Sequence, residues 1–137
     1  TTMNTKIFVN IAVKDLEQSK AFFQALGFTF NDQFTDETAA SMVINDSIYF
    51  MLLTYHKFQS FIKDHNIANP NLINESIYAL SVDSRQEVDE FMDKVLTAGG
   101  QIFREPEDYG YMYARSFTDL DGHVWEILWM DPNHIQS

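Results

Sequence analysis

Short apolar runs and two amphipathic segments follow one another along this chain in an order that occurs twice. The first run, residues 6–13, is rich in β-branched and aromatic residues, which is typical of a strand. Asp15 then offers an N-cap to a segment whose apolar residues keep a helical spacing as far as Gly27, a C-terminal stop. Three further apolar runs predict strands at residues 28–34, 39–44 and 47–54.

After the first set of strands, residues 55–66 have a helical spacing that predicts a short helix or ordered loop, and a polar connector follows. The same order of elements then returns in the second half. Ser84 and Glu87 form a capping-box signature at the start of an amphipathic helix that ends at Gly99. The remaining apolar runs predict strands at residues 76–82, 101–104, 111–117 and 123–129.

This repeated layout predicts an α+β fold made of two βαβββ modules. A shift of 69 residues places Val13 on Val82 and Phe22 on Phe91. We expect one domain, residues 1–137, with module one at about 5–66, a connector at 67–74 and module two at 75–131. Two such modules can form an eight-stranded open barrel, or cup, with a helix flanking each module. A ferredoxin-like sheet is the alternative, but it needs only four strands.

Glu126 is the residue that most needs an explanation. Asp121-Gly122 favours a tight hairpin turn, and the strand after it places Glu126 between Trp125 and Ile127. A carboxylate among large apolar residues needs a partner, a metal ion or solvent. Glu126 is therefore a candidate general base or ligand contact, or else a structural residue paired with Arg115, Asn10, a Tyr hydroxyl or water.

Composition and charge exclude several classes of partner. The formal net charge of −11 repels phosphate backbones and anionic membrane surfaces, so neither nucleic acid nor membrane is expected as a partner. No apolar run reaches the roughly 18 residues that would span a bilayer. The chain has no cysteine, which excludes disulfides and thiolate metal sites and agrees with a cytoplasmic location.

Two motifs carry a resemblance to a known superfamily. They are Val-Lys-Asp-Leu-Glu-Gln-Ser at 13–19 with Leu-Gly-Phe at 26–28, and Asp-Leu-Asp-Gly-His at 119–123 leading to Trp125-Glu126. With two βαβββ modules, the chain resembles the vicinal oxygen chelate superfamily, which includes glyoxalase I, extradiol dioxygenases, fosfomycin-resistance enzymes and bleomycin-resistance proteins. The resemblance implies a homodimer and, in the enzymes, a divalent metal ion.

The resemblance also places the four metal-ligand positions of the family on this sequence. They fall on Phe8, Leu52, Ile77 and Glu126. Three of the four are hydrocarbon, whereas a divalent ion needs several nitrogen or oxygen donors. We therefore expect no metal ion at this site and no other cofactor.

Two functions from different classes remain open. The first is a metal-free protein that binds a small organic molecule, cationic or aromatic, in the cup; its candidate contacts are Asn10, Phe50, Tyr113, Arg115 and Glu126. The alternative is a glyoxalase I-like lyase or isomerase that uses Glu126 as a general base or holds a metal differently. The sequence names neither the ligand nor the dimer geometry, and it leaves open whether residues 55–74 form a lid.

Overall fold

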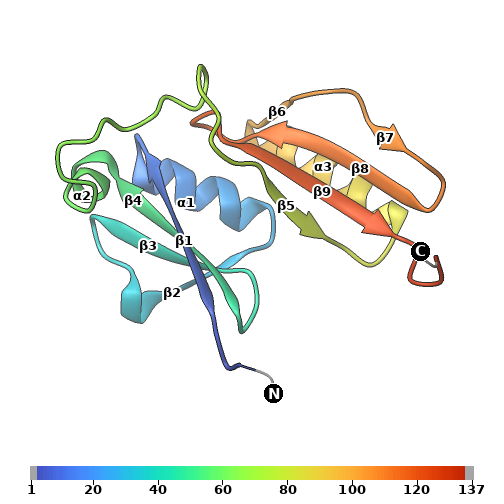
Figure 1. Cartoon of the computed structure of the whole chain (residues 1–137), viewed down its shortest axis with the longest axis horizontal. Helices are drawn as coiled ribbons and strands as arrows, with labels where there is room; N and C mark the ends of the chain where they lie inside the picture. The colour runs from blue at the N-terminus through green and yellow to red at the C-terminus, as the bar shows by residue number, and fades with distance from the viewer. Residues whose placement is uncertain (1–2, 135–137) are drawn as a thin grey trace. The chain divides into compact units, whose positions relative to one another are not determined.

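The computed structural model describes residues 3–134, and the chain divides into two compact units, residues 1–67 and 68–137. Each unit has the order strand, helix and further strands, so the predicted pair of βαβββ modules is present (Figure 1). Among the described residues, every strand pairs only with strands of its own unit. No helix between residues 3 and 134 has both the length and the apolar character needed to cross a bilayer.

Unit one is built around a four-stranded sheet. Its elements are β1 (Ile7–Val13), α1 (Leu16–Ala25), β2 (Thr29–Asn31), the 3-10 turn η1 (Asp32–Phe34), β3 (Ala39–Val43), β4 (Ile48–Thr54) and α2 (Tyr55–Gln59). The strand order is β1-β4-β3-β2, with β1 and β4 parallel and the other pairs antiparallel. The Asp15 side chain accepts a hydrogen bond from the Gln18 backbone N–H at 3.1 Å, so the predicted N-cap of α1 is confirmed.

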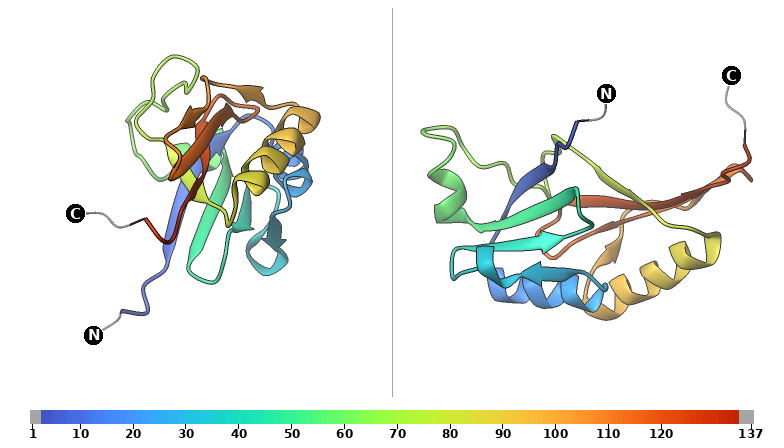
Figure 2. Two further views of the ribbon diagram at one scale, coloured as in Figure 1. Left: turned by 90° about the vertical axis from the view of Figure 1, so that its right-hand side faces the viewer. Right: turned by 90° about the horizontal axis from the view of Figure 1, so that it is seen from below.

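The strand register separates the residues of the first sheet into two faces. Ile11 is paired with Leu52, and both are almost fully buried on the face that α1 covers (Figure 2). Asn10 is paired with Met51 one residue earlier, so both side chains lie on the opposite face. The face away from α1 is therefore the one that can receive a ligand.

Unit two contains a five-stranded sheet. Its elements are β5 (Tyr78–Ser81), α3 (Arg85–Ala98), β6 (Gln101–Ile102), β7 (Glu107–Asp108), β8 (Met112–Thr118) and β9 (Val124–Met130). The order is β5-β9-β8-β6, with β7 also paired to β8. Ser84 accepts from the Glu87 backbone N–H at 3.1 Å, and the Glu87 carboxylate accepts from the Asp83 backbone N–H at 2.8 Å. These bonds confirm the predicted start of α3.

Helix α3 covers one face of the β8–β9 pair. Phe91 of the helix contacts Phe117 of β8, with ring centroids 5.9 Å apart. Glu126 of β9 is paired with Ser116 of β8, the neighbour of Phe117, so Glu126 and Ser116 lie on the face opposite α3.

Several strands are shorter than predicted, and one strand is additional. Local hydrogen bonds account for two of the shorter strands. The strand expected at 28–34 ends at Asn31, because the Asn31 side chain accepts from the Gln33 backbone N–H and starts η1. The strand expected at 101–104 ends at Ile102, since the Arg104 backbone N–H donates to the Ser116 hydroxyl at 3.1 Å. The short β7 was not predicted, so the described residues contain nine strands instead of eight.

Candidate functional site

A hollow of about 360 Å³ opens on the face of the first sheet away from α1. Five side chains from four elements line it: Phe8, Asn10, Phe34, Ser41 and Met51. The register explains why three of them meet, because Met51 is paired with Asn10 on one side and with Ser41 on the other. These three side chains therefore form one row across the sheet, with Met51 in the middle.

Ser41 is the most enclosed polar residue of the hollow. Only 3% of its surface is exposed, and its backbone N–H donates to the Thr35 hydroxyl at 3.1 Å. Among residues 3–134 its own hydroxyl makes no hydrogen bond, yet no fully enclosed side-chain oxygen or nitrogen of the described residues lacks a partner. The Ser41 hydroxyl is therefore still accessible, and the space that it meets is the hollow.

Aromatic rings form the sides of the hollow. Phe8 stacks on Tyr49 with ring centroids 4.9 Å apart and planes 11° apart, and 54% of Phe8 remains exposed. Phe34, at the end of η1, is also largely exposed. None of the five lining residues carries a charge. This combination of apolar walls and a few polar groups is typical of sites for small organic molecules.

Glu126, on the second sheet, already has a cationic partner. Its carboxylate forms an ion pair with the Arg104 guanidinium, which also donates to Glu107 at 2.8 Å. The Tyr109 hydroxyl donates to the other oxygen of Glu107 at 3.0 Å. The hydrogen bonds that Arg104 donates to Glu126 and then to Glu107 raise the pKa of Arg104, although burial opposes them. The partner that the structure gives Glu126 is therefore Arg104, whereas the proposed partner Arg115 pairs with Asp89.

Two of the predicted contact residues, Tyr113 and Arg115, are bound to helix α3 and not to Glu126. The Tyr113 hydroxyl and the Arg115 guanidinium both donate to Asp89 of α3, at 2.7 and 2.9 Å. Tyr113 and Arg115 thus lie on the α3 face of the sheet, opposite Glu126. Burial and, less strongly, the hydrogen bond to Asp89 raise the pKa of Tyr113, so this hydroxyl stays protonated.

Unit one shows the same separation of predicted contacts. Phe50 is 3% exposed and lies on the α1 face, whereas Asn10 lines the hollow. Of the five residues predicted to contact a ligand, Asn10 alone belongs to the hollow. Ser41 was missed because nothing in the sequence distinguishes a serine that opens into a hollow from other serines in strands.

The register also corrects one of the predicted metal-ligand positions. Leu52 faces α1, so it does not share a face with Phe8. In unit two, Ala79 is paired with Glu126. The 69-residue shift places Asn10 of unit one on Ala79. Asn10 is paired with Met51. The counterpart of Glu126 is therefore Met51 and not Leu52.

The residues at these positions do not fit a divalent ion. Phe8 and Ile77 offer no donor atom, Met51 offers only a weak thioether sulfur, and the Glu126 carboxylate is held by Arg104. The guanidinium supplies the positive charge that a metal ion would otherwise bring to the carboxylate. The donor chemistry of this chain thus disagrees with a metal centre of the family type.

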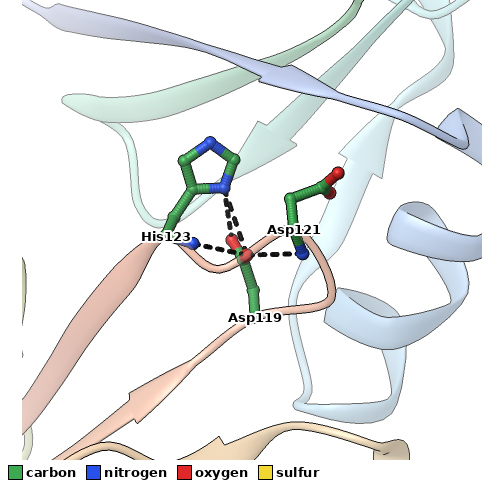
Figure 3. Close-up of side chains that lie close together, drawn as sticks. All are labelled: Asp119, Asp121 and His123. Carbon is green, nitrogen blue, oxygen red and sulfur yellow. Dashed lines mark hydrogen bonds and ion pairs between the residues drawn. The ribbon is translucent and has the colours of Figure 1, made fainter. Parts of the chain in front are cut away.

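A second group of candidate ligands lies in the turn between β8 and β9. Potential ligand atoms of Asp119, Asp121 and His123 lie within 4.8 Å of one another (Figure 3). The Asp119 carboxylate, however, accepts from the backbone N–H groups of Asp121 and His123, both at 3.0 Å, and lies 2.9 Å from His123 Nδ1. It also accepts from the Trp125 indole N–H at 3.0 Å. Its oxygens are used in holding the turn together.

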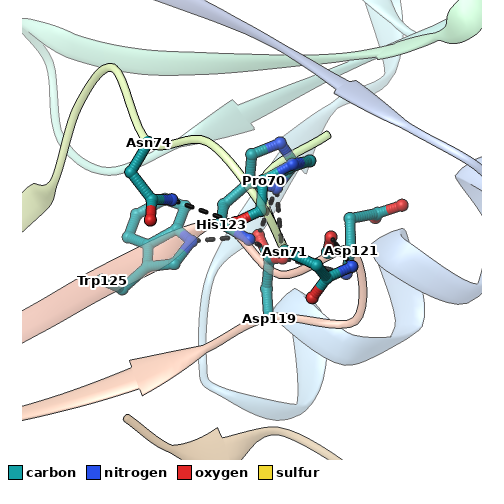
Figure 4. A network of polar contacts seen from close by, with 7 residues as sticks. All are labelled: Pro70, Asn71, Asn74, Asp119, Asp121, His123 and Trp125. Atoms are coloured by element: carbon teal, nitrogen blue, oxygen red, sulfur yellow. Dashed lines mark hydrogen bonds and ion pairs between the residues drawn. The ribbon is translucent and has the colours of Figure 1, made fainter. Parts of the chain in front are cut away.

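The connector before β5 reaches the same turn. The Asn71 side chain donates to the Asp121 carbonyl at 3.3 Å, and the Asn74 side chain donates to the Pro70 carbonyl at 3.1 Å (Figure 4). The predicted two-residue hairpin is wrong, because residues 119–123 form a longer loop in which the Asp119 backbone N–H donates to the His123 carbonyl. Gly122 has the expected positive φ, +97°.

Comparisons with known proteins agree with this architecture. Residues 7–127 match the family model described as the Glyoxalase/Bleomycin resistance protein/Dioxygenase superfamily. Among solved structures, a hypothetical protein from S. aureus is 31% identical, with a TM-score of 0.76 and coverage of 94% of this chain and 95% of that one. A search of curated proteins gives no match.

More distant structures share the fold. A glyoxalase-related enzyme from Fulvimarina pelagi is 21% identical, with a TM-score of 0.79 over 93% of this chain and 88% of that one. A fosfomycin resistance protein from Mesorhizobium loti is 15% identical, with a TM-score of 0.67 over 93% of each chain. These likenesses confirm the predicted α+β class with its two βαβββ modules.

Proposed function

Because the chain belongs to the Glyoxalase/Bleomycin resistance protein/Dioxygenase superfamily, we propose that it binds a small organic molecule in the hollow of its first sheet without a metal ion. The observation that carries the proposal is the hollow itself. Its volume of about 360 Å³ falls within the range of roughly 300–1,000 Å³ found for small-molecule sites. Its lining joins two exposed aromatic rings to two polar side chains, which is enough to orient a ligand.

The chemistry of Glu126 supports binding over catalysis. A general base must have a carboxylate free to take a proton, but Glu126 is paired with Arg104, which Glu107 also holds in place. The same pair argues against a cationic ligand at Glu126, because the position beside the carboxylate is filled.

A fluorescence titration tests this proposal. Prodan, a neutral naphthyl ketone whose emission changes when it leaves water, should bind saturably at one site per chain. Asn10→Trp should weaken binding at least tenfold, because the indole would fill the hollow. Glu17→Trp, an exposed substitution on α1, serves as the control and should bind like the native chain.

Two results would overturn the proposal. The first is a native chain without saturable prodan binding, and the second is an Asn10→Trp variant that binds as tightly as the control. The competing function, a glyoxalase-like lyase, is tested in parallel with the hemithioacetal of methylglyoxal and a thiol. Turnover that Glu126→Gln abolishes would establish the enzyme instead.

A further inference from the structure

We propose that the hollow selects a flat, neutral aromatic molecule with a hydrogen-bond acceptor at one end and a donor at the other. Ser41 would bind the acceptor and Asn10 the donor, and the aromatic ring would lie over Met51 between them. This inference rests on the proposed function of the hollow and adds the chemical class of its ligand.

Ser41 carries the first half of the inference. Its hydroxyl is the only hydroxyl among the five side chains that line the hollow, and it belongs to a residue that is only 3% exposed. The hydroxyl is open to water in the empty hollow, so a hydrocarbon that displaces this water leaves it without a partner, whereas a ligand that offers an acceptor replaces the lost hydrogen bond. A carbonyl oxygen is such an acceptor.

Asn10 is the residue that would bind the donor group of the ligand. One hydrogen of its amide nitrogen is used in a bond to the Phe8 carbonyl at 3.3 Å, whereas the amide oxygen has both lone pairs for a ligand. An amide oxygen accepts, so the ligand group that matches it is a donor such as a hydroxyl or an N–H. The proposed ligand therefore offers an acceptor to Ser41 and a donor to Asn10.

The register fixes the separation of these two groups. Asn10, Met51 and Ser41 are consecutive partners across β1, β4 and β3. Neighbouring strands lie about 4.8 Å apart, so the outer two Cα atoms are separated by roughly 10 Å. Both side chains stand on the same face of the sheet, so a benzene ring that lies over Met51 can offer one polar substituent to each.

The floor and walls suit an aromatic ring. The Met51 thioether under the centre can make favourable sulfur–aromatic contacts, and Phe8 and Phe34 present exposed rings at the sides. The five lining residues include no charged side chain, so a charged ligand would lose hydration without gaining a partner. The ligand is therefore neutral, although the chain as a whole carries a net charge of −11.

Three matched probes test the inference, with dissociation constants measured by NMR titration of the labelled protein. The first, para-hydroxyacetophenone, carries both groups; acetophenone lacks the donor; and para-ethylphenol lacks the acceptor. For the native chain, para-hydroxyacetophenone should bind roughly 3- to 10-fold more tightly than either of the other two, as expected for one hydrogen bond.

Two variants then assign each bond to its residue. Ser41→Ala should weaken para-hydroxyacetophenone and acetophenone by the same roughly 3- to 10-fold and leave para-ethylphenol unchanged. Asn10→Ala should weaken the two phenols and leave acetophenone unchanged. Ser47→Ala, an exposed serine of the same unit, is the control for folding and should change nothing.

The outcomes separate this inference from the function on which it rests. Prodan binding with equal affinities for all three probes would overturn the inference alone. The inference also fails, and the proposed function stands, if Ser41→Ala weakens all three probes equally, because Ser41 then makes no bond that is specific to the acceptor. If neither prodan nor any probe binds, both the inference and the proposed function fail.

Discussion

The pairing of Glu126 with Arg104 determines what this carboxylate can do. Only 17% of the Glu126 side chain is exposed, so its charge depends on an internal partner. Arg104, in the loop after β6, supplies the positive charge that pairs with Glu126, and its guanidinium also pairs with Glu107. The ion pair with Arg104 therefore holds this carboxylate within the second unit.

Removing Arg104 should destabilise the chain more than removing its exposed partner. Arg104→Gln leaves Glu126 enclosed without its ion pair, and we expect a loss of about 1–2 kcal/mol in the free energy of unfolding, reduced from the buried limit because Arg104 is partly exposed. Glu107→Gln should cost less than half as much. Urea denaturation monitored by circular dichroism measures both.

The double variant Arg104→Met with Glu126→Met completes this experiment. Replacing both charges by apolar side chains should recover most of the loss, because no enclosed charge remains. An Arg104→Gln chain as stable as the native one would show that water solvates Glu126 fully. The ion pair would then have no structural role.

The sequence showed that Glu126 needs a partner but did not show that the partner is Arg104. A carboxylate between Trp125 and Ile127 is conspicuous in a strand, which is why its need for a partner could be predicted. Arg104 is 22 residues away along the chain, and only the β6–β8 register brings it close. The Asp119 network was missed for a related reason, because Asp119 stands outside the Asp-Gly pair that signals the turn.

At the scale of elements, the loop between β8 and β9 depends on Gly122 for two reasons. Its φ of +97° disfavours any side chain, and a Cβ atom there would lie 2.3 Å from the Asn71 amide oxygen. Gly110, in the turn between β7 and β8, has a φ of +80°, but a Cβ atom there would have no other atom within 4 Å. A side chain at Gly110 would therefore cause backbone strain alone, whereas a side chain at Gly122 would cause both backbone strain and a steric clash with Asn71.

Alanine substitutions should show this difference. Gly110→Ala should cost about 1 kcal/mol of unfolding free energy from backbone strain alone. Gly122→Ala should cost roughly 1–2 kcal/mol more, since Asn71 must also move and lose its hydrogen bond to Asp121. Thermal unfolding of both variants measures the difference, and equal losses would show that Asn71 moves away freely.

The β7 arm is tied to the start of α3 by an ion pair that can be titrated. Arg85 pairs with Asp108, and its guanidinium lies 4.5 Å from the centroid of the Tyr113 ring. The hydrogen bond from Arg85, with a second from the Gly110 backbone N–H, lowers the pKa of Asp108 from 3.8 to about 2. A carboxyl group whose pKa is lower in the folded state than in the unfolded state stabilises the folded state at a pH above its unfolded pKa. For Asp108 this contribution disappears as the pH falls from 3.8 towards 2.

The pH dependence gives a direct measurement of this link. In Arg85→Gln the pKa of Asp108 should rise towards 3.8, as followed by NMR of its carboxyl carbon during an acid titration. Lys94→Gln, on an exposed position of the same helix, should leave it low. An Asp108 pKa that stays near 2 in Arg85→Gln would assign the effect to the Gly110 N–H instead.

Helices were easier to predict than strand faces, and capping residues explain why. Asp15, Ser84 and Gly99 mark helix ends through local hydrogen bonds and backbone geometry, which the sequence states directly. Strand faces alternate with a period of two, so an error of one residue moves every side chain to the other face. This error made Leu52, and not Met51, the counterpart of Glu126 in the repeat, and it put Phe50 among the ligand contacts.

At the scale of the whole molecule, membership of the superfamily fixes the fold but not the chemistry. The family model covers residues 7–127, yet the positions of its metal ligands hold Phe8, Met51, Ile77 and an already paired Glu126. The function must therefore be argued from the residues of this chain. They favour a hollow for an organic molecule over a metal centre.

Metal removal and addition should leave the protein unchanged. We expect the same melting temperature in EDTA and with added nickel, zinc or manganese, because ligand binding to the folded state would raise it. Elemental analysis of the purified chain provides the second measurement. Stoichiometric metal that is lost in Glu126→Gln would contradict the metal-free proposal, whereas metal lost only in Asp119→Asn would place a site in the β8–β9 turn.

The confinement of strand pairing to each unit has a consequence for how the protein is made. All strand partners of the first sheet lie between residues 7 and 54, and the β5 strand of the second sheet begins only at residue 78. During synthesis at the ribosome, the first sheet can close before the strands of the second have emerged from the exit tunnel. The nascent chain can therefore protect its amino-terminal half early, and the carboxyl-terminal half folds later, when the first unit is already complete.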